Sequence, residues 1–546
     1  MVSAADTHEV FNQTPPFAGL NLFTSDPALG ALVEGLPQVV VDQLVEHGAQ
    51  WGTPETFELG RIANVATPTL RSFDASGTRI DSLEFHPAYH ALMRRSVAAG
   101  IQCSVWDASG EEASVRAVSR AARMYISAAV ETGHLVPLAM TNAAVAALAH
   151  TPNLADVWLP RIRTRRYDSA QRPLTAKAAA LVSLGFTEKQ GGSDLSSITS
   201  AAVESSDGMW RVTGHKWFLS APASDAYLVL AQTVEGLTCF LVPRYLNDGT
   251  LNGIRLMRLK DAMGQRSNAI GEIELDHAAA WLVGEFGGAA ATIVDLQALM
   301  RLDAAVAAAG MMRLALAESV HHCRHRKAAG QSLIDQPLMT RVLADMALDT
   351  VAAAALAFRL AESYDRAGDD PAEAAFARLM TPAVKYWVTK VAPTMIGEAM
   401  EALGGNAYVE DSHLPRLYRD APAQSMSEGT GNVMALEVMR VLRKSSEPLE
   451  SVLANVEDAL GNTAKSTLNV LRAATAVALA DEGSARILTE QLAMTVAAAA
   501  LRRRFPSVVA DAFLETRLGK PWRATYGMLD SRFDARAFVN YLCPAD

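Results

Sequence analysis

The stretch MWRVTGHKWFLS, residues 209–220, is rich in aromatic and β-branched residues and comes directly after the pair Asp207-Gly208. The run ITSAAVES, residues 198–205, precedes that pair. Since Asp and Gly both tolerate the positive φ of a tight turn, the two runs predict a β-hairpin. Similar runs follow: AYLVLAQT (226–233), LTCFLVPR (237–244) and GEIELDH (271–277). The sequence therefore predicts a β domain in the middle of the chain.

Helical patterns lie on both sides of this β domain. Between residues 27 and 175 apolar residues recur at spacings of three and four, for example in segment 113–132. Residues 67–83 interrupt this pattern with turn formers and are interpreted as a connector. Beyond the β domain, few Gly and Pro residues occur in three long segments, 293–325, 336–367 and 371–403. The sequence predicts a long helix for each of them.

Together these patterns indicate an α+β protein that is mainly α. We expect an N-terminal arm and helical domain (1–180), a central antiparallel β domain (181–290), a helical bundle (291–444) and a C-terminal helical extension (445–546). The extension begins at the breaker cluster Ser445-Ser446-Glu447-Pro448. The first 26 residues mix Pro and Gly with Phe and Leu, which suits an extended arm, and such arms often cross to another subunit.

Composition bounds the function classes. Half of the 546 residues are hydrophobic and 20% are charged, which excludes collagen-like and disordered proteins. The net charge of −10 argues against a surface built as a whole to bind nucleic acid. The four cysteines are scattered and the chain has no apolar run long enough for a bilayer, so we expect a cytoplasmic protein without a membrane span.

Two segments are dense in small and hydrogen-bonding residues: TEKQGGSD (187–194) and EGTGN (428–432). A third cluster, His321, His322, Cys323 and His325, lacks an H-E-x-x-H pattern or a carboxylate partner, so we expect no metal site. Loops such as the first two often contact ligands, and their order in the chain carries more information than either loop alone.

In order, the chain contains helices, a T-E-x-x-G-G-S-D loop, a G-x-K-W-x-x-S strand, and helices that end in L-Y-R-D and E-G-T-G-N. This order resembles the flavin-dependent acyl-CoA dehydrogenase family over residues 27–444. The stretches VFNQTPP, ELGRIANV, FHPAYHALM, IDQPLM and LPRLYRD are similar to its AidB-like branch, which is named for a protein of the adaptive response to DNA alkylation and also carries a C-terminal helical extension.

The resemblance implies a bound FAD, with the 187–194 loop and the strand before Ser220 running past its ring. Backbone amides and hydroxyls there stabilise the charge that a flavin gains when it accepts hydride. An arginine at position 326 is expected to bind the pyrophosphate, often of a neighbouring subunit's cofactor. The FAD contacts implied are Leu184, Phe186, Thr187, Gly192, Ser193, Phe218, Leu219, Ser220, Arg326, Gly404, Gly405, Thr430 and Asn432.

The chain departs from the family pattern at two places. The usual R-x-x-F-G continuation reads RKAAG at 326–330, without the Phe that packs beside the adenine. The usual G-G-x-G reads GGNA at 404–407, and Ala407 is expected to crowd a backbone close to the cofactor.

The resemblance implies that Glu428 is the catalytic base. Oxidation of an acyl thioester removes a proton α to the carbonyl while hydride leaves the β carbon, and burial raises a carboxyl pKa toward neutrality. Some subfamilies place the base on the long helix, directly before the arginine matched by Arg301; that position is Met300, a thioether that cannot accept the proton. Arg301 itself is expected to contact substrate.

The implied partners are acyl-CoA or another acyl thioester, an electron-transfer flavoprotein or similar acceptor, and three further copies in a homotetramer. A second class of function stays open: binding of double-stranded DNA to protect against alkylation, with weak or vestigial dehydrogenase activity. The extension carries eleven Lys plus Arg and twelve Asp plus Glu, so it is not basic as a unit. The candidate DNA contacts within it are Arg502, Arg503, Arg504, Arg517 and Lys520.

Overall fold

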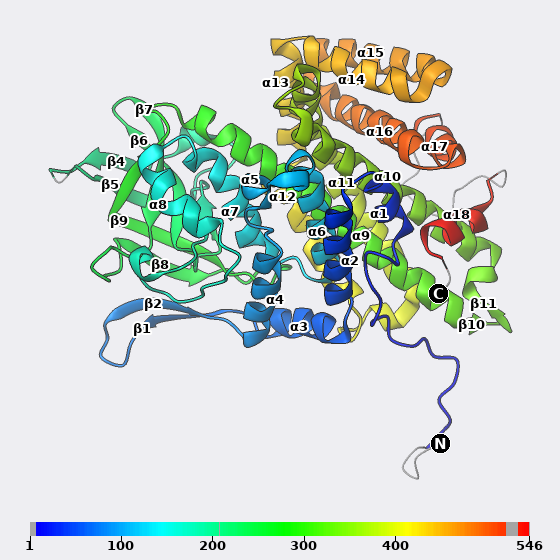
Figure 1. Ribbon diagram of the computed structural model, residues 1–546, viewed down its shortest axis with the longest axis horizontal. Coiled ribbons are helices and arrows are strands. Elements are labelled where there is room, and N and C mark those ends of the chain that lie inside the picture. Colours follow the sequence, from blue (N-terminus) through cyan, green and yellow to red (C-terminus); the bar gives the residue numbers. More distant parts are fainter. Residues whose placement is uncertain (1–6, 207, 520–532, 545–546) are drawn as a thin grey trace.

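The computed structural model describes residues 7–206, 208–519 and 533–544. Figure 1 shows the β domain at one end of an elongated molecule and helices filling the rest, with the C-terminal helices α14 to α17 forming an outer layer. This is the mainly helical α+β layout that the sequence predicts.

The N-terminal part is helical, as predicted. Several of its helices begin with Pro in the first turn, where the missing N–H costs nothing, and Asp26 and Thr53 cap two of them through side-chain oxygens. The helices are α1 (Pro27–Leu32), α2 (Gln38–Trp51), α3 (Pro54–Val65), α4 (Pro87–Ala98), α5 (Ser104–Asp107), α6 (Arg116–Val130), α7 (Leu135–Leu148) and α8 (Pro152–Ile162).

The connector expected at 67–83 is in fact an antiparallel hairpin of β1 (Thr69–Phe73) and β2 (Arg79–Glu84). Asp74 Oδ1 accepts hydrogen bonds from the backbone N–H groups of Ser76 and Thr78, so the turn formers close a hairpin rather than a loop. The hairpin also bonds to the β domain, because Leu256 N donates to Asp81 Oδ2 at 2.9 Å. The two strands are short, and contacts with residues far along the chain stabilise them. Local sequence patterns do not reveal such contacts.

In the residues that the structure describes, the β domain contains seven strands in one sheet. The predicted hairpin is present as β4 paired with β5, with Gly208 at φ +76° in the turn; Asp207 lies outside the described residues. Most pairings are antiparallel, but β3 pairs with β6 in parallel, and β4 meets β6 in parallel at one position. The strands are β3 (Val182–Gly185), β4 (Ala201–Glu204), β5 (Trp210–Ser220), β6 (Ala226–Thr233), β7 (Gly236–Pro243), β8 (Ile254–Leu259) and β9 (Ile270–Val283).

Long helices follow the β domain. The three predicted long segments are confirmed, and a helix ends and the next begins at the predicted break near 445. The bundle helices are α9 (Ala289–His325), α10 (Pro337–Arg366), α11 (Pro371–Leu403), α12 (Leu414–Met426) and α13 (Gly431–Lys444). The extension contains α14 (Glu447–Leu460), α15 (Ala464–Ala480), α16 (Ala485–Arg504), α17 (Ser507–Phe513) and α18 (Ala535–Leu542).

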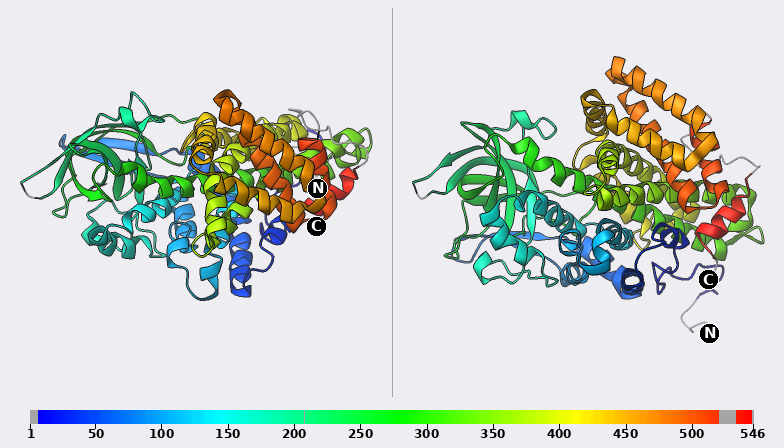
Figure 2. Two further views of the ribbon diagram at one scale, coloured as in Figure 1. Left: turned by 90° about the horizontal axis from the view of Figure 1, so that it is seen from above. Right: turned by 45° about the horizontal axis from the view of Figure 1, so that its top comes forward.

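The extension shares its core with the bundle. Leu488, Leu492 and Leu501 of α16 are fully buried, and α16 packs on both α10 and α11. Figure 2 shows α16 lying between the bundle and α15. The extension is therefore packed as a further layer of the bundle rather than as a separate globule.

The N-terminal arm lies along its own chain. Thr14 Oγ1 is 2.9 Å from His322 Nδ1, and His321 Nε2 is 2.9 Å from the carbonyl oxygen of Pro15, both at the C-terminal end of α9. In the described residues the arm therefore packs on the C-terminal end of α9 in the same chain. Within those residues no helix is long and apolar enough to span a membrane.

Candidate active site

Glu428 lies in the short loop between α12 and α13 and has an unusual backbone. Its φ is +53°, and Gly429 follows at φ +106°. A non-glycine residue in the left-handed region costs about 1–2 kcal/mol and persists only when its surroundings hold it there. The side chain is half-buried. The residue that is expected to be the base therefore has a strained backbone.

Two buried cations hold this loop in place. Arg301 of α9 donates from Nε to the carbonyl oxygen of Glu428 at 3.1 Å. Lys385 of α11 donates from Nζ to the carbonyl oxygen of Ser427 at 2.7 Å and also to that of Gly429. The predicted substrate residue Arg301 thus contacts the backbone of the predicted base, and Lys385 is a site residue that the sequence reasoning missed.

Burial dominates the electrostatics of the loop. It raises the pKa of Glu428, and the positive charges of Arg301 and Lys385 offset only part of that rise. Burial likewise lowers the pKa of Lys385 to about 7. Met300, next to Arg301, is 8% exposed and has no ionisable group. A carboxyl with a raised pKa is suited to accept a proton near neutral pH.

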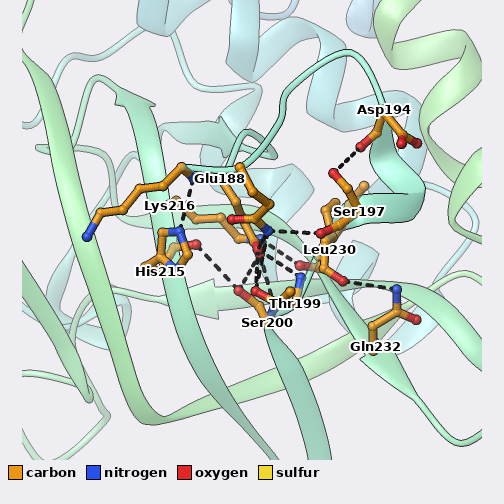
Figure 3. A network of polar contacts seen from close by, with 12 residues as sticks. Glu188, Asp194, Ser197, Thr199, Ser200, His215, Lys216, Leu230 and Gln232 are labelled. Atoms are coloured by element: carbon orange, nitrogen blue, oxygen red, sulfur yellow. Dashed lines mark hydrogen bonds and ion pairs between the residues drawn. The ribbon is translucent and has the colours of Figure 1, made fainter.

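The 187–194 loop is fixed from beneath by a buried ion pair. Glu188 accepts from Lys216 Nζ at 2.7 Å, from Ser200 Oγ at 2.5 Å and from Thr199 N at 2.8 Å, and the loop residue Gln190 adds a further bond at 2.6 Å (Figure 3). Burial by itself would raise the pKa of Glu188, but these donors hold it well below its usual range. Glu188 therefore fixes the loop and has no free oxygen for chemistry.

The predicted flavin residues lie on this loop and on strand β5, and the two are bonded to each other. Trp217 N donates to the carbonyl oxygen of Thr187 at 2.8 Å. Strand β5 has a bulge between Lys216 and Leu219, so both of these residues point inward while Phe218 is 46% exposed. The fold therefore brings the candidate flavin residues of the 187–194 loop and of strand β5 together.

The side chains present fit a flavin. In the part of the chain that the structure describes, the hydroxyls of Thr187, Ser193 and Ser220 donate to no protein group, so they are available to a ligand. A Cβ at Gly192 would lie 2.9 Å from Thr187 Oγ1, which explains the glycine. Leu184 and Leu219 are buried beneath, and Phe186 is partly buried.

Arg326 directly follows helix α9, and Gly404 and Gly405 follow α11 toward the same end of the bundle, because Ser319 Oγ of α9 donates to the carbonyl oxygen of Ala399 of α11 at 3.3 Å. The Nη1 of Arg326 donates to the carbonyl oxygen of Asn12 at 2.5 Å. In place of the family's Phe, Ala329 and Gly330 take φ values of +50° and +81° in the turn between β10 (Lys327–Ala328) and β11 (Gln331–Ser332). At the position where the family has Phe, the chain therefore forms the turn of a tight hairpin.

The glycine segment GGNA directly follows α11. Gly404 has φ +65° and ends the helix, and a Cβ at Gly404 or Gly405 would meet no atom within 4 Å. The methyl group of Ala407 is fully buried in the core. Thr430 is exposed before the first turn of α13, and Asn432 Oδ1 lies 3.4 Å from Arg486 Nη1 of the extension.

The candidate DNA arginines that the structure describes each form an ion pair within the chain. Arg502 pairs with Asp511, Arg503 with Asp458 at 2.8 Å, and Arg504 with Glu362 at 2.5 Å. Arg517 pairs with Asp345 and Asp349. Lys520 lies outside the described residues.

Fold and site together define a flavin-dependent oxidoreductase of the acyl-CoA dehydrogenase family, to which the chain belongs. The adaptive response protein AidB N-terminal domain matches residues 12–169. The acyl-CoA dehydrogenase middle domain matches 183–278, and the acyl-CoA dehydrogenase C-terminal domain matches 290–443.

Individual relatives agree with this family. The chain is 45% identical to AidB of Escherichia coli (strain K12) over 81% of each protein. It is 32% identical to acyl-CoA dehydrogenase family member 11 of Caenorhabditis elegans, over 83% of this chain and 75% of the relative. The crystal structure of Caenorhabditis elegans ACDH-11 in complex with C11-CoA superposes with a TM-score of 0.82 at 27% identity, over 100% of this chain and 94% of that one.

Proposed function

We propose that the protein introduces an α,β double bond into an acyl thioester, with Glu428 as the base. The observation that carries this proposal is the loop geometry: a half-buried carboxyl with a raised pKa, in a strained conformation that two buried cations hold. A structural carboxylate gains nothing from such strain, whereas a base aimed at one carbon requires a fixed direction.

FAD supplies the hydride acceptor for this reaction. The residues proposed to hold it are the hydroxyls of Thr187, Ser193 and Ser220, the exposed ring of Phe218 and the segment at 430–432; Gly404 and Gly405, which lie toward the Arg326 end of the bundle, are proposed to contact the cofactor of a neighbouring subunit. Glu428 takes the α proton as the β carbon loses its hydride, so the substrate leaves as an enoyl thioester with two electrons and one proton on the cofactor and one proton on the carboxyl.

Arg326 is proposed to serve the FAD of a neighbouring subunit in a homotetramer. Arg301 and Arg326 are 25 positions apart on or at the end of the same helix, which corresponds to about 37 Å. One cofactor held near Glu428 does not reach that far within one chain. An arginine at this place is useful for FAD binding only if a second subunit brings its cofactor to it.

The proposed substrate is an acyl-CoA, since the relative from Caenorhabditis elegans was crystallised with C11-CoA. The proposed electron acceptor is an electron-transfer flavoprotein, as the family membership implies. The four cysteines are free and buried, which agrees with the reducing compartment expected from the sequence and supports a cytoplasmic location.

Anaerobic titration of the yellow holoprotein with a panel of acyl-CoA thioesters of different chain lengths tests this function. We expect at least one thioester to bleach the flavin band stoichiometrically and to yield the enoyl thioester. Chemical reduction with dithionite provides the full-bleach control. Bleaching by dithionite but by no thioester contradicts the proposed reaction.

DNA binding is kept as a second proposed function because residues 12–169 match the AidB N-terminal domain. The ion pairs of Arg502, Arg503 and Arg504 weigh against the particular contacts expected from the sequence, since a guanidinium already bonded to a carboxylate gains less from a phosphate. A DNA surface would then have to lie elsewhere on the protein.

A further inference from the structure

Lys385 lies in the middle of the 33-residue helix α11 and is 1% exposed. Its ammonium group has three hydrogens, and three carbonyl oxygens receive them: that of Ser425 at 3.2 Å, that of Ser427 at 2.7 Å, and that of Gly429. Ser425 belongs to the last turn of α12, where the helix dipole also favours a cation. All three hydrogens of the lysine ammonium are therefore donated to the backbone of residues 425–429.

Lys385 and Arg301 divide the loop carbonyls between them. Lys385 takes the carbonyls of residues 427 and 429, and Arg301 takes the carbonyl of Glu428 between them. The two peptide units that flank the Glu428 Cα are thus fixed by two different helices, α9 and α11. Fixing both units fixes φ and ψ of Glu428, and with them the direction of its Cα–Cβ bond.

The charge of Lys385 is not needed for an ion pair in the core. In residues 7–206, 208–519 and 533–544, no carboxylate lies within salt-bridge distance of its Nζ, and Glu428 is the acid whose field it feels. Burying an ammonium without a carboxylate partner is costly, so a merely structural position is better filled by an apolar residue.

We propose that Lys385 is a positioning residue that aims the Glu428 carboxylate by bonding the carbonyls on either side of it. This proposal rests on the proposed function of Glu428 as the base. An ammonium suits the task because three carbonyls converge on one point, whereas an arginine spreads its donors over several nitrogens in one plane. The lysine acts through the loop, since all three of its hydrogens go to backbone carbonyls of residues 425–429.

The test is Lys385→Met in the FAD-loaded protein, with Lys444→Met as the matched control. Met keeps the length of the side chain and removes the ammonium; Lys444 is exposed at the far end of α13 and contacts no loop carbonyl. We expect the rate of flavin reduction at saturating thioester to fall about 10²-fold, with KM and the FAD content within about threefold of wild type. Lys444→Met should match wild type in all three.

A double variant tests whether Lys385 affects the reduction rate by orienting Glu428. If Lys385 acts through Glu428, adding Lys385→Met to Glu428→Gln should change the residual reduction rate by less than about twofold. A further large loss in that background would mean that the lysine acts by another route and would overturn the proposal.

Crystal structures give a readout that is independent of activity. In Lys385→Met we expect the carbonyls of 427–429 to turn and the Glu428 carboxylate to move, while α11 and α12 stay in place. An unmoved loop with a wild-type reduction rate would overturn the proposal. If no thioester reduces even the wild-type flavin, the proposed function fails, and the loop geometry still decides whether Lys385 fixes Glu428.

A conservative variant keeps the test decisive if Lys385→Met does not fold. Lys385→Arg retains the charge but places its donors in one plane on a larger group, so the carbonyls of 425, 427 and 429 must shift to meet it, and we expect folded, yellow protein with a reduction rate at least tenfold lower. A wild-type rate in Lys385→Arg would show that three-point contact is not required.

Discussion

At the scale of single residues, the protonation state of Glu428 should control the rate. Only the ionised carboxylate accepts a proton, and burial raises its pKa above the usual 4.5. We therefore expect the rate of flavin reduction at saturating thioester to rise with pH through that raised pKa and to fall again above about pH 7, where Lys385 loses the proton that its three carbonyl contacts require. Stopped-flow reduction across a pH series checks this. A rate that is already maximal at pH 4.5 would contradict the raised pKa.

Glu131 is a second buried carboxylate, and its role is structural. It accepts from Asn64 Nδ2, Gly133 N and Ser267 Oγ, and its Oε2 lies 2.6 Å from His134 Nδ1. His134 Nε2 in turn lies 2.8 Å from Ser96 Oγ, which reproduces the order of a hydrolase triad. Each member is at most 1% exposed, so no substrate reaches the serine. The set ties α3, α4, α7 and the loop before β9 together.

Replacing the Glu131 carboxylate should lower the free energy of unfolding at pH values above the range in which the carboxylate titrates. Burial by itself would raise the pKa of Glu131, but the bonds from His134 and Asn64 hold it at about 2, below the usual 4.5. Its stabilisation is therefore complete above pH 4.5 and is lost as the pH falls toward 2. We expect Glu131→Gln to lower the free energy of unfolding by about 3 kcal/mol at pH 7. Urea unfolding measures this.

The exposed Glu58 provides the control for that measurement. Glu58→Gln removes a surface carboxylate and should change stability by less than about 1 kcal/mol. If Glu131→Gln loses no more than Glu58→Gln does, or keeps the acid dependence of wild type between pH 4.5 and 2, the structural role assigned to Glu131 is wrong.

At the scale of elements, the crossing of α6 and α9 depends on Gly310. A Cβ at this position would lie 2.3 Å from the carbonyl oxygen of Tyr125, a backbone atom that cannot rotate away. Alanine favours an isolated helix by about 1 kcal/mol over glycine, but overpacking a core costs about 1–3 kcal/mol and a backbone clash lies at the upper end. We expect Gly310→Ala to be less stable than wild type by thermal unfolding.

Gly30 offers a matched helical glycine. It lies in α1, and a Cβ there would meet no atom within 4 Å, so Gly30→Ala should be neutral or more stable by up to about 1 kcal/mol. Equal effects of the two substitutions would contradict the account of the α6–α9 contact.

The elements that the sequence predicts best are those with long local patterns. Helices α9, α10 and α11 match their predicted ranges within a few residues, because few breakers interrupt them. Strand β8 was missed because Arg255 and Arg258 interrupt its apolar pattern, and Arg258 is in fact paired with Glu272 of the neighbouring strand. The bulge in β5 depends on the pairing with β9, which no local pattern contains.

The candidate site was predictable in part for a similar reason. Glu428 and the 187–194 loop stand out through their residue types, whereas Lys385 is one of six charged residues in helix α11. Its neighbours in the sequence, Val384, Tyr386 and Trp387, are the signal, since a lysine among buried residues requires an acceptor. Its acceptors are 40 to 44 positions later in the chain, so only the fold identifies them.

At the scale of the whole molecule, the arginines at 502–504 should stabilise the extension rather than bind DNA. Three phosphate contacts would change the slope of log affinity against log salt by about three. We expect the triple change to Ala to leave the slope of any DNA binding within about one, and to lower the melting temperature because three ion pairs to α10, α14 and α17 are lost. A slope flatter by about three would restore the DNA assignment.

The central claim is that Glu428 takes the α proton, and Glu428→Gln tests it most directly. The amide keeps the size of the side chain and its hydrogen-bonding capacity but cannot serve as the base. We predict a yellow protein with full FAD content whose anaerobic reduction by the best thioester is slower by about 10²- to 10⁴-fold. Reduction at the wild-type rate in that variant would contradict the mechanism.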